Sequence, residues 1–210
     1  MKAWFLLIFF SQVTFAQTAK IHDVIDELLH STHQGILEKT DDKFSYSLYE
    51  IDSDQYFFVS NLTWKRFVLG KSEYRIGHNP KIFNLGIPDD ALKGVLAHEL
   101  NHTEDYVFGS SLGTILPIGV KVSFKKSRAQ YERKTDLKVV LKGLGKELLA
   151  YKEWQYQQLT HEMLERKKRE YLTPEEIRLI MKIKDQRPEL MKKWLRGKIP
   201  ANLEEMKKQI

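Results

Sequence analysis

The sequence predicts an α+β fold, in which a small, antiparallel-rich sheet is followed by a mostly helical C-terminal half. Aromatic and β-branched residues form short runs between residues 44 and 85, and such runs are typical of strands. From residue 88 onward, apolar residues recur at helical spacing instead. The chain of 210 residues contains no cysteine, so an apolar core has to hold this fold together without disulfides.

The first residues predict an exported chain. Lys2 precedes the apolar run of residues 3–10, and Thr14-Phe15-Ala16 offers small residues at the positions that a signal peptidase reads. We therefore expect residues 1–16 to be a signal peptide, cleaved before Gln17, and the mature chain to be periplasmic or extracellular. The alternative is an uncleaved N-terminal anchor.

A helix and then a β-rich segment follow. Apolar residues between Ile21 and Leu29 recur at helical spacing and predict an amphipathic helix that ends near Ser31. Turn residues at His78-Asn79-Pro80 interrupt the later β-rich segment. Its expected strands lie at residues 44–48, 55–60, 66–69, 74–76 and 82–85.

The next predicted helix contains the pattern that most clearly indicates a functional site, His98-Glu99-Leu100-Asn101-His102. Two histidines four residues apart lie on one face of a helix, so both imidazoles can bind one metal ion. The glutamate between them projects about 100° round the helix, beside the ion rather than on it. This layout can hold Zn²⁺ and places Glu99 where it can accept a proton from a zinc-bound water.

The surroundings of this pattern favour a buried metal helix. Pro88-Asp89-Asp90 is typical of a helix start. An apolar stripe flanks the histidine side, at Leu92, Val95, Leu96, Leu100 and Val107. The alternative is a buried helix whose histidines are ordinary polar residues without a metal. A related pattern, His161-Glu162-Met163-Leu164-Glu165, ends in glutamate within a charge-rich helix, and we interpret it as a solvated face.

A catalytic zinc ion usually keeps three protein ligands, so a third ligand is expected elsewhere in the chain. Glu132 and Asp136 lie four residues apart on a predicted helix, so one can bind the ion while the other orients a histidine. The alternatives are that both are surface charges, or that Glu104 or Asp105 is the ligand. Asp105 falls on the histidine face one turn further along the helix, which favours an orienting role over ligation.

With these residues the chain resembles the gluzincin metallopeptidases, and in particular the family of the CAAX prenyl proteases and HtpX-type peptidases. That family has a His-Glu-x-x-His helix and a later helix with Glu-x-x-Ala-Asp, whose glutamate is the third zinc ligand. The resemblance covers roughly residues 72–140, with Thr135 in place of the alanine. The short spacing between the motifs is similar to that of the small soluble minigluzincins.

The resemblance implies a zincin-like metallopeptidase domain over residues 17–150, whose sheet packs on the motif helix. The implied zinc ligands are His98, His102 and Glu132, with Asp136 placed behind them to orient a histidine. The implied cofactor is a single Zn²⁺ ion.

Two further expectations concern substrate binding and the C-terminal part. In zincin-like folds an exposed edge strand binds an extended peptide through backbone hydrogen bonds, and we expect the segment near residues 74–85 to do so. The alternative is a core strand without a substrate role. Residues 151–210 are expected to form a helical extension packed on the domain, with a new helix starting at Thr173-Pro174-Glu175-Glu176.

The formal net charge of +6 is unevenly distributed, because basic residues dominate after residue 120 and acidic residues before it. Such basic character can mark nucleic-acid binding. Expected export and the interleaving of Lys and Arg with Glu along helices argue against that partner. We expect a solvated helical surface, with peripheral association to an anionic envelope surface as a second interpretation.

These features together predict a secreted or periplasmic zinc metallopeptidase that hydrolyses peptide or protein substrates. Glu99 is the expected general base, and Tyr131, Arg128 or Tyr151 is the expected donor to the oxyanion. The alternative is a non-catalytic zincin-like envelope protein that binds or scaffolds, with a structural metal or none. A third hypothesis is latency, in which the basic C-terminal helices cover the site.

Overall fold

The computed structural model describes residues 2–62, 74–109 and 125–210, and its elements fall into two compact units, Met1–Ile87 and Pro88–Ile210. This division lies at a different position from the expected boundary at residue 150, and the separate status of residues 151–210 stays a prediction.

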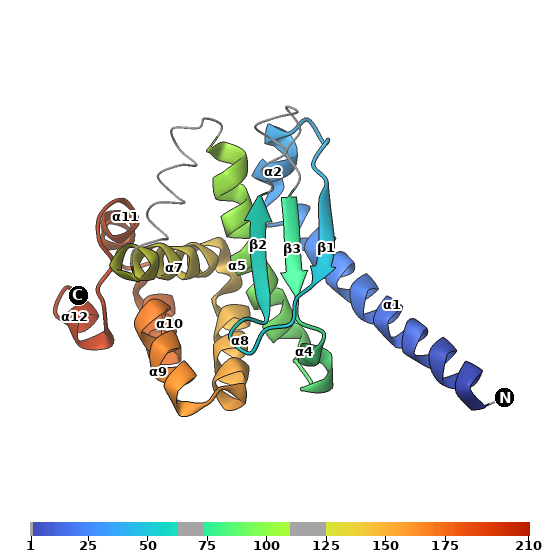
Figure 1. Cartoon of the computed structure of the whole chain (residues 1–210). Helices are drawn as coiled ribbons and strands as arrows, with labels where there is room; N and C mark the ends of the chain where they lie inside the picture. The colour runs from blue at the N-terminus through green and yellow to red at the C-terminus, as the bar shows by residue number, and fades with distance from the viewer. Residues whose placement is uncertain (1, 63–73, 110–124) are drawn as a thin grey trace. The chain divides into compact units, whose positions relative to one another are not determined.

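The first unit combines helices with a three-stranded sheet. In the sheet, β3 lies between β1 and β2, as Figure 1 shows. Strand β3 is parallel to β1 and antiparallel to β2. The elements are α1 (Lys2–Leu29), α2 (Gln34–Lys39), β1 (Tyr46–Glu50), β2 (Phe58–Leu62), β3 (Tyr74–His78) and α4 (Lys81–Asn84).

The α+β class is therefore confirmed, but the sheet is mixed rather than antiparallel-rich. The expected strand at residues 82–85 is wrong, because the helix α4 occupies that segment directly after the turn at Asn79 and Pro80. The expected strand at residues 66–69 lies outside the described residues.

The position of β3 also overturns an expectation about substrate binding. Its backbone pairs with β1 on one side and with β2 on the other, so β3 has no free edge on which a peptide could add a strand. Tyr74 and Ile76 are buried, as the alternative of a core strand requires. The described edge strands of this sheet are β1 and β2.

The N-terminal helix α1 contributes to the core of this unit through its C-terminal half. Ile21, Ile25 and Leu28 are fully buried and follow the helical spacing of the sequence. A hydrogen bond joins His22 Nδ1 and the Tyr46 hydroxyl, 2.7 Å apart, and ties α1 to strand β1. Among the described residues, no helix is long and apolar enough to cross a membrane.

The second unit is helical, and it contains every residue of the expected metal site. Its elements are α5 (Asp89–Phe108), α7 (Lys125–Val139), the π-helical turn η1 (Val140–Leu144), α8 (Gly145–Gln158), α9 (His161–Glu170), α10 (Pro174–Ile183), α11 (Pro188–Arg196) and α12 (Leu203–Lys207). Since the sheet belongs to the other unit, packing of the sheet on α5 stays a prediction.

Helix α5 starts as the sequence predicts. Pro88 is its N-cap, and Asp89 and Asp90 lie in its first turn. The predicted stripe is buried throughout. At Gly94 the helix comes so close to α8 that a Cβ atom would lie 2.2 Å from the carbonyl oxygen of Glu147. Only glycine fits there, and this close approach fixes α5 against α8.

The chain from α7 to α8 does not run as one continuous helix in the structure. Gly143 has a φ of 89°, a left-handed conformation that favours glycine, and it marks a kink within η1. The chain therefore changes direction between α7 and α8. The predicted start at Thr173 is confirmed: its hydroxyl accepts from the Glu176 N–H, and the Glu176 carboxylate accepts from the Thr173 N–H.

Candidate metal centre

The two histidines of the motif lie on the buried face of α5. His98 is 5% exposed and His102 is 8% exposed. Because they are four residues apart on one helix, their Nε2 atoms converge to 3.0 Å from each other. Their rings meet edge to face. Neither histidine is therefore a solvated surface residue.

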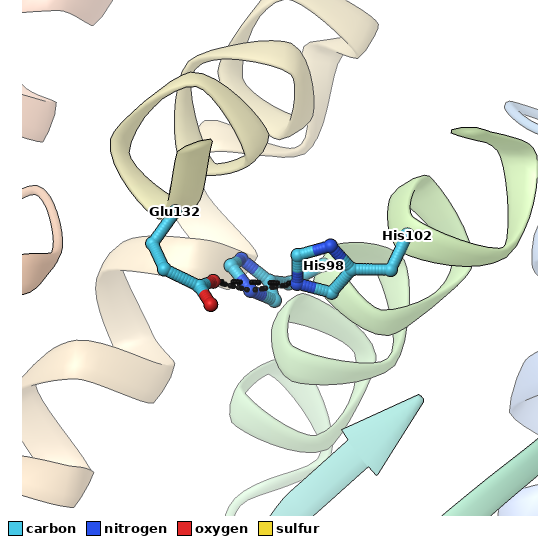
Figure 2. Close-up of side chains that lie close together, drawn as sticks. All are labelled: His98, His102 and Glu132. Atoms are coloured by element: carbon cyan, nitrogen blue, oxygen red, sulfur yellow. Dashed lines mark hydrogen bonds and ion pairs between the residues drawn. The ribbon is translucent and has the colours of Figure 1, made fainter. Parts of the chain in front are cut away.

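Helix α7 brings Glu132 to the same point, as Figure 2 shows. Its Oε2 atom lies 3.2 Å from His98 Nε2 and 3.3 Å from His102 Nε2. In a tetrahedral site with metal–ligand distances of about 2.0–2.1 Å, neighbouring ligand atoms lie about 3.3 Å apart. The three atoms thus have the separations that one ion requires, and this buried group could hold a metal ion.

Asp136, one turn further along α7, holds His98 from behind. Its Oδ1 atom lies 2.8 Å from His98 Nδ1, so the ring donates its Nδ1–H to the carboxylate and directs Nε2 toward Glu132. The other carboxylate oxygen accepts from Lys152 Nζ at 3.1 Å and from the Leu172 N–H at 2.9 Å. Asp136 is fully buried, so the interpretation of a surface charge is wrong, and the orienting role fits.

The other histidine of the group, His102, is hydrogen-bonded to a tyrosine. His102 Nδ1 lies 3.0 Å from the Tyr131 hydroxyl, and the two ring centroids are 5.0 Å apart. Burial, and after it the charge of Asp105, raises the pKa of the Tyr131 hydroxyl. Asp105 in turn forms an ion pair with Lys138. Asp105 thus pairs with Lys138 and does not join the group of side chains that could hold an ion.

The surroundings of Glu132 and His98 shift the pKa values of these two groups in opposite directions. Burial alone would raise the pKa of Glu132, but the charge and hydrogen bonds of His102 and His98 outweigh it and hold the pKa well below its usual range. Burial alone would lower the pKa of His98, but the charge and hydrogen bond of Asp136 outweigh it and raise the pKa to about 9. Without a metal, these groups form a hydrogen-bonded ion-pair cluster.

Glu99 has a different environment from the ligands. It is 6% exposed, and no hydrogen bond or ion pair to its carboxylate is found within the described residues. Burial raises its pKa, and the neighbouring charges of His102 and His98 offset only part of that effect. Glu99 is thus a buried carboxylate of raised pKa next to the group that could hold a metal ion.

The rival ligands that the sequence left open do not join the group. Glu104 pairs with Lys142, at 2.9 Å from the Nζ atom. Asp105 pairs with Lys138. Within the described residues, the one set of side chains that could hold an ion is His98, His102 and Glu132.

The expected oxyanion donors occupy different positions. The Tyr131 hydroxyl is hydrogen-bonded to His102 Nδ1, and the Tyr151 hydroxyl accepts from Gln155 Nε2 at 2.8 Å. Arg128 Nε lies 4.0 Å from Glu132 Oε1. Of the three, Arg128 is thus the one whose charge lies beside Glu132.

Sequence reasoning missed the contribution of the segment after α9. The Tyr171 ring lies 5.9 Å from the His98 ring, between centroids, and Lys152 and Lys167 lie over it at 4.4 and 4.8 Å. Lys167 is buried on α9. No local pattern marks these residues, because their role comes from the path of the chain between α9 and α10.

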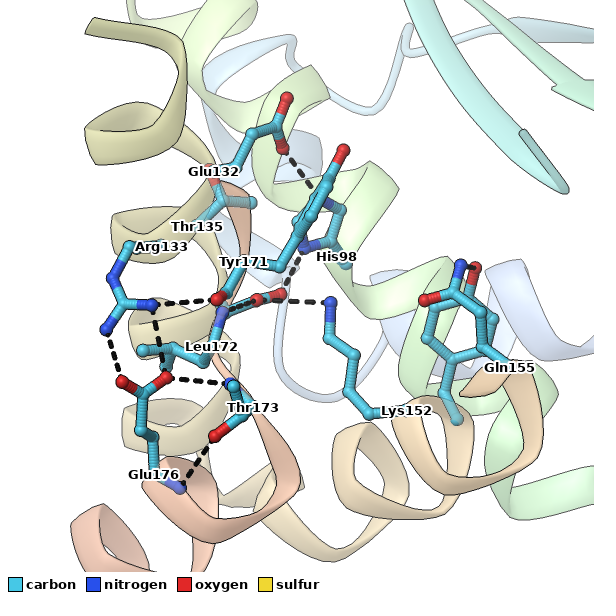
Figure 3. A network of polar contacts seen from close by, with 12 residues as sticks. His98, Glu132, Arg133, Thr135, Lys152, Gln155, Tyr171, Leu172, Thr173 and Glu176 are labelled. Atoms are coloured by element: carbon cyan, nitrogen blue, oxygen red, sulfur yellow. Dashed lines mark hydrogen bonds and ion pairs between the residues drawn. The ribbon is translucent and has the colours of Figure 1, made fainter. Parts of the chain in front are cut away.

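A buried network anchors that segment to α7, as Figure 3 shows. Arg133 donates to both carboxylate oxygens of Glu176, at 3.1 and 2.8 Å, and to the Tyr171 carbonyl at 2.8 Å. Its Nε atom donates to the Pro200 carbonyl at 3.0 Å. One face of α7 therefore carries residues of the candidate metal centre, and another face binds the C-terminal segment. This binding places the Leu172 N–H against Asp136.

The donor set suits a divalent transition metal. Two imidazole nitrogens and one carboxylate oxygen lie in a buried pocket of side chains, and an orienting partner holds each histidine. No family model, curated protein or solved structure matches the chain. The geometry and burial of these side chains support a metal centre.

Proposed function

We propose that the protein is a zinc-dependent metallopeptidase of the gluzincin type. The observation that carries this proposal is Glu99, a buried carboxylate of raised pKa directly beside the ligand group on α5. A metal with a purely structural role has no use for such a base. A base next to a group of three ligands is the arrangement that hydrolysis requires.

Zinc is the metal that this donor set fits best. His98, His102 and Glu132 would hold it, and three protein ligands leave a coordination position for water or substrate. When bound, zinc supplies Lewis acidity, which makes water more acidic and polarises the carbonyl group of a peptide. Asp136 and Tyr131 keep the histidine rings in place meanwhile.

Glu99 would perform the proton transfers of the reaction. Its carboxylate accepts one proton from the water whose oxygen attacks the carbonyl carbon, and it delivers that proton to the nitrogen of the leaving amine. One water is consumed, the C–N bond breaks, and the products are a carboxylate and an amine. The raised pKa of Glu99 brings it nearer to neutral pH, which suits both acceptance and release of the proton.

The decisive experiment compares Glu99→Gln with Glu162→Gln. Both variants change a glutamate that follows a histidine, but Glu162 lies exposed on α9. We expect Glu99→Gln to keep one zinc ion per chain and to lose about 10²–10⁴-fold in the cleavage rate of a mixed peptide library. Glu162→Gln should match the wild type in both measurements. Equal cleavage by wild type and Glu99→Gln would show that the assigned base is wrong.

The same experiment also tests the alternative function, that of a non-catalytic envelope protein. Wild-type protein that binds one zinc ion and cleaves neither casein nor the peptide library would favour a non-catalytic envelope protein with a structural metal. The substrate class in our proposal is peptide or protein, and the chain acts in the periplasm or outside the cell after removal of residues 1–16.

A further inference from the structure

Tyr171 lies beside the candidate metal centre, and its hydroxyl takes no part in the network around that centre. The ring centroid is 5.9 Å from that of His98. In Figure 3 the ring extends from the backbone next to Leu172 toward Glu132, so the hydroxyl points to the end of the network where Glu132 meets His98. Within the described residues, no hydrogen bond to this hydroxyl is found. Its O–H is therefore available to a ligand at the centre.

The backbone on both sides of Tyr171 is fixed. Its N–H donates to the Lys167 carbonyl at 2.9 Å, and its carbonyl accepts from Arg133 Nη1 at 2.8 Å. The next N–H, that of Leu172, donates to Asp136 at 2.9 Å. The position of the ring is thus set before any ligand arrives. A donor held in this way needs no reorganisation when charge develops beside it.

Positive charge surrounds the Tyr171 ring. The ammonium groups of Lys152 and Lys167 lie over it, at 4.4 and 4.8 Å from its centroid, and the face of an aromatic ring attracts such cations. Burial, and after it the charge of Glu132, raises the pKa of the Tyr171 hydroxyl well above its usual value, so this group keeps its proton. The side of the centre where Tyr171 lies therefore offers an O–H donor and nearby positive charge, which together favour a developing negative charge.

The other two tyrosines near the centre use their hydroxyls differently. The Tyr131 hydroxyl is bonded to His102 Nδ1, the nitrogen that faces away from Glu132 and His98. The Tyr151 hydroxyl accepts from Gln155 on its own helix. Tyr171 was not among the donors that the sequence predicts, because its place beside His98 comes from the path of the chain between α9 and α10.

We propose that Tyr171 is a catalytic residue whose hydroxyl donates a hydrogen bond to the oxyanion of the tetrahedral intermediate. This inference rests on the proposed function, because it assigns a role in the same hydrolysis. When the water oxygen adds to the carbonyl carbon, the π electron pair of the C=O bond moves onto the carbonyl oxygen. Tyr171 donates to that oxygen, and its own O–H bond stays intact. The pair returns to the C=O bond as the C–N bond breaks and Glu99 gives its proton to the amine nitrogen.

The first experiment measures the hydrolysis of one quenched peptide, chosen from those that wild type cleaves, by the zinc-loaded full chain. We expect Tyr171→Phe to lower kcat about 10²–10³-fold, as the loss of one oxyanion donor does, and to change KM less than about twofold. The phenylalanine keeps the ring in its place, so zinc affinity and melting temperature should equal those of wild type. An unchanged kcat, or a loss that only follows zinc affinity or stability, would overturn the assignment.

Tyr156→Phe is the matched control. Tyr156 lies on α8, and its hydroxyl is also buried and without a hydrogen-bond partner in the part of the chain that the structure describes. Unlike Tyr171, it makes none of the described ring contacts with the histidines. We expect its kcat and KM to equal those of wild type. An equal loss of kcat in both variants would show that the effect does not come from a donor at the centre.

The second experiment needs no turnover. A peptide phosphonate carries a tetrahedral anion in place of the reacting carbonyl, and calorimetry measures its binding to the zinc-loaded chain. We expect Tyr171→Phe to weaken phosphonate binding about 10²-fold, since the hydroxyl acts on the tetrahedral anion. Binding of the uncleaved peptide should be the same in Glu99→Gln and Glu99→Gln/Tyr171→Phe, because the planar carbonyl carries no such charge.

These outcomes separate the inference from the proposed function. If wild type cleaves no peptide but binds the phosphonate with this dependence on Tyr171, the proposed function fails and the donor role stands. If wild type and Tyr171→Phe bind the phosphonate equally, or if neither binds it, the inference fails even in an active peptidase.

Discussion

Two helices of the second unit begin a similar pattern, and only one of them builds a site. On α5, His98-Glu99 and the later His102 are buried among partners from α7 and the segment after α9. On α9, His161 and Glu162 are exposed, and Glu165 pairs with Lys168 on its own helix. The difference lies in what faces each helix: α7 places Glu132 and Asp136 against the histidine of α5, and His161 and Glu162 of α9 face solvent.

This contrast shows what a short pattern requires before it becomes a metal centre. Burial removes water from the histidines, and buried polar groups need partners. Residues of α7 provide them, with Glu132 and Asp136 on His98 and Tyr131 on His102. The exposed residues of α9 have water as a partner instead. A similar sequence pattern therefore does not place them in a group that could hold a metal.

The largest effect is expected from removing a ligand on one helix and its counterpart on the other. His102→Ala should weaken zinc binding roughly 10²–10³-fold, since each ligand contributes several of the about 10–16 kcal/mol typical of a zinc site. His161→Ala should leave it unchanged. Isothermal titration with zinc measures both, and thermal unfolding checks that both variants fold. Equal binding by His102→Ala and wild type would break the comparison.

A smaller effect is expected from the acid that orients His98. Asp136→Asn removes its charge and should lower zinc affinity about tenfold, while Glu165→Gln on α9 should have no effect. Because Lys152 would be left buried beside a neutral amide, the double variant Asp136→Asn/Lys152→Met provides a second test with the charge balanced. Unchanged affinity in both variants would show that Asp136 does not orient the ligand.

Zinc affinity is also expected to depend on pH. In the metal-free protein the pKa of His98 is raised to about 9, so its proton has to leave before Nε2 can bind. Affinity should therefore fall about tenfold for each pH unit below 9 and level off above it. Chelator competition between pH 7 and 10 measures this, and a flat profile would contradict it.

The same shift has an opposite consequence for the metal-free fold. A pKa raised from 6.5 to about 9 means that protonated His98 stabilises the folded state fully below pH 6.5. That contribution is lost as the pH rises through 9. The melting temperature of metal-free wild type should fall over this window, and Asp136→Asn should make the fall smaller, since Asp136 is the main group that raises the pKa.

Much of the second unit follows from local sequence. The start of α5 at Asp89, its buried stripe and the start of α10 after Thr173 are as predicted, because capping and helical spacing act within a few residues. The kink at Gly143 was not predicted, since a glycine in a helical pattern can be tolerated or can interrupt the helix. The mixed sheet depends on the pairing of β1 with β3, which lie far apart in the sequence.

The sequence by itself determined which groups could hold a metal. The spacing of His98 and His102, with Glu99 between them, fixes one face of one helix, and the spacing of Glu132 and Asp136 fixes another. These are local relations that helix geometry sets.

Only the tertiary structure decided that the two faces meet. It placed Glu132 Oε2 3.2 Å from His98 Nε2, and it brought Tyr131, Lys152 and the Leu172 N–H to the ligands and their partners. These contacts join residues far apart in the chain, and they depend on the packing of whole helices. No local pattern encodes that packing, because it follows from the burial of apolar faces shared by all the helices of the unit.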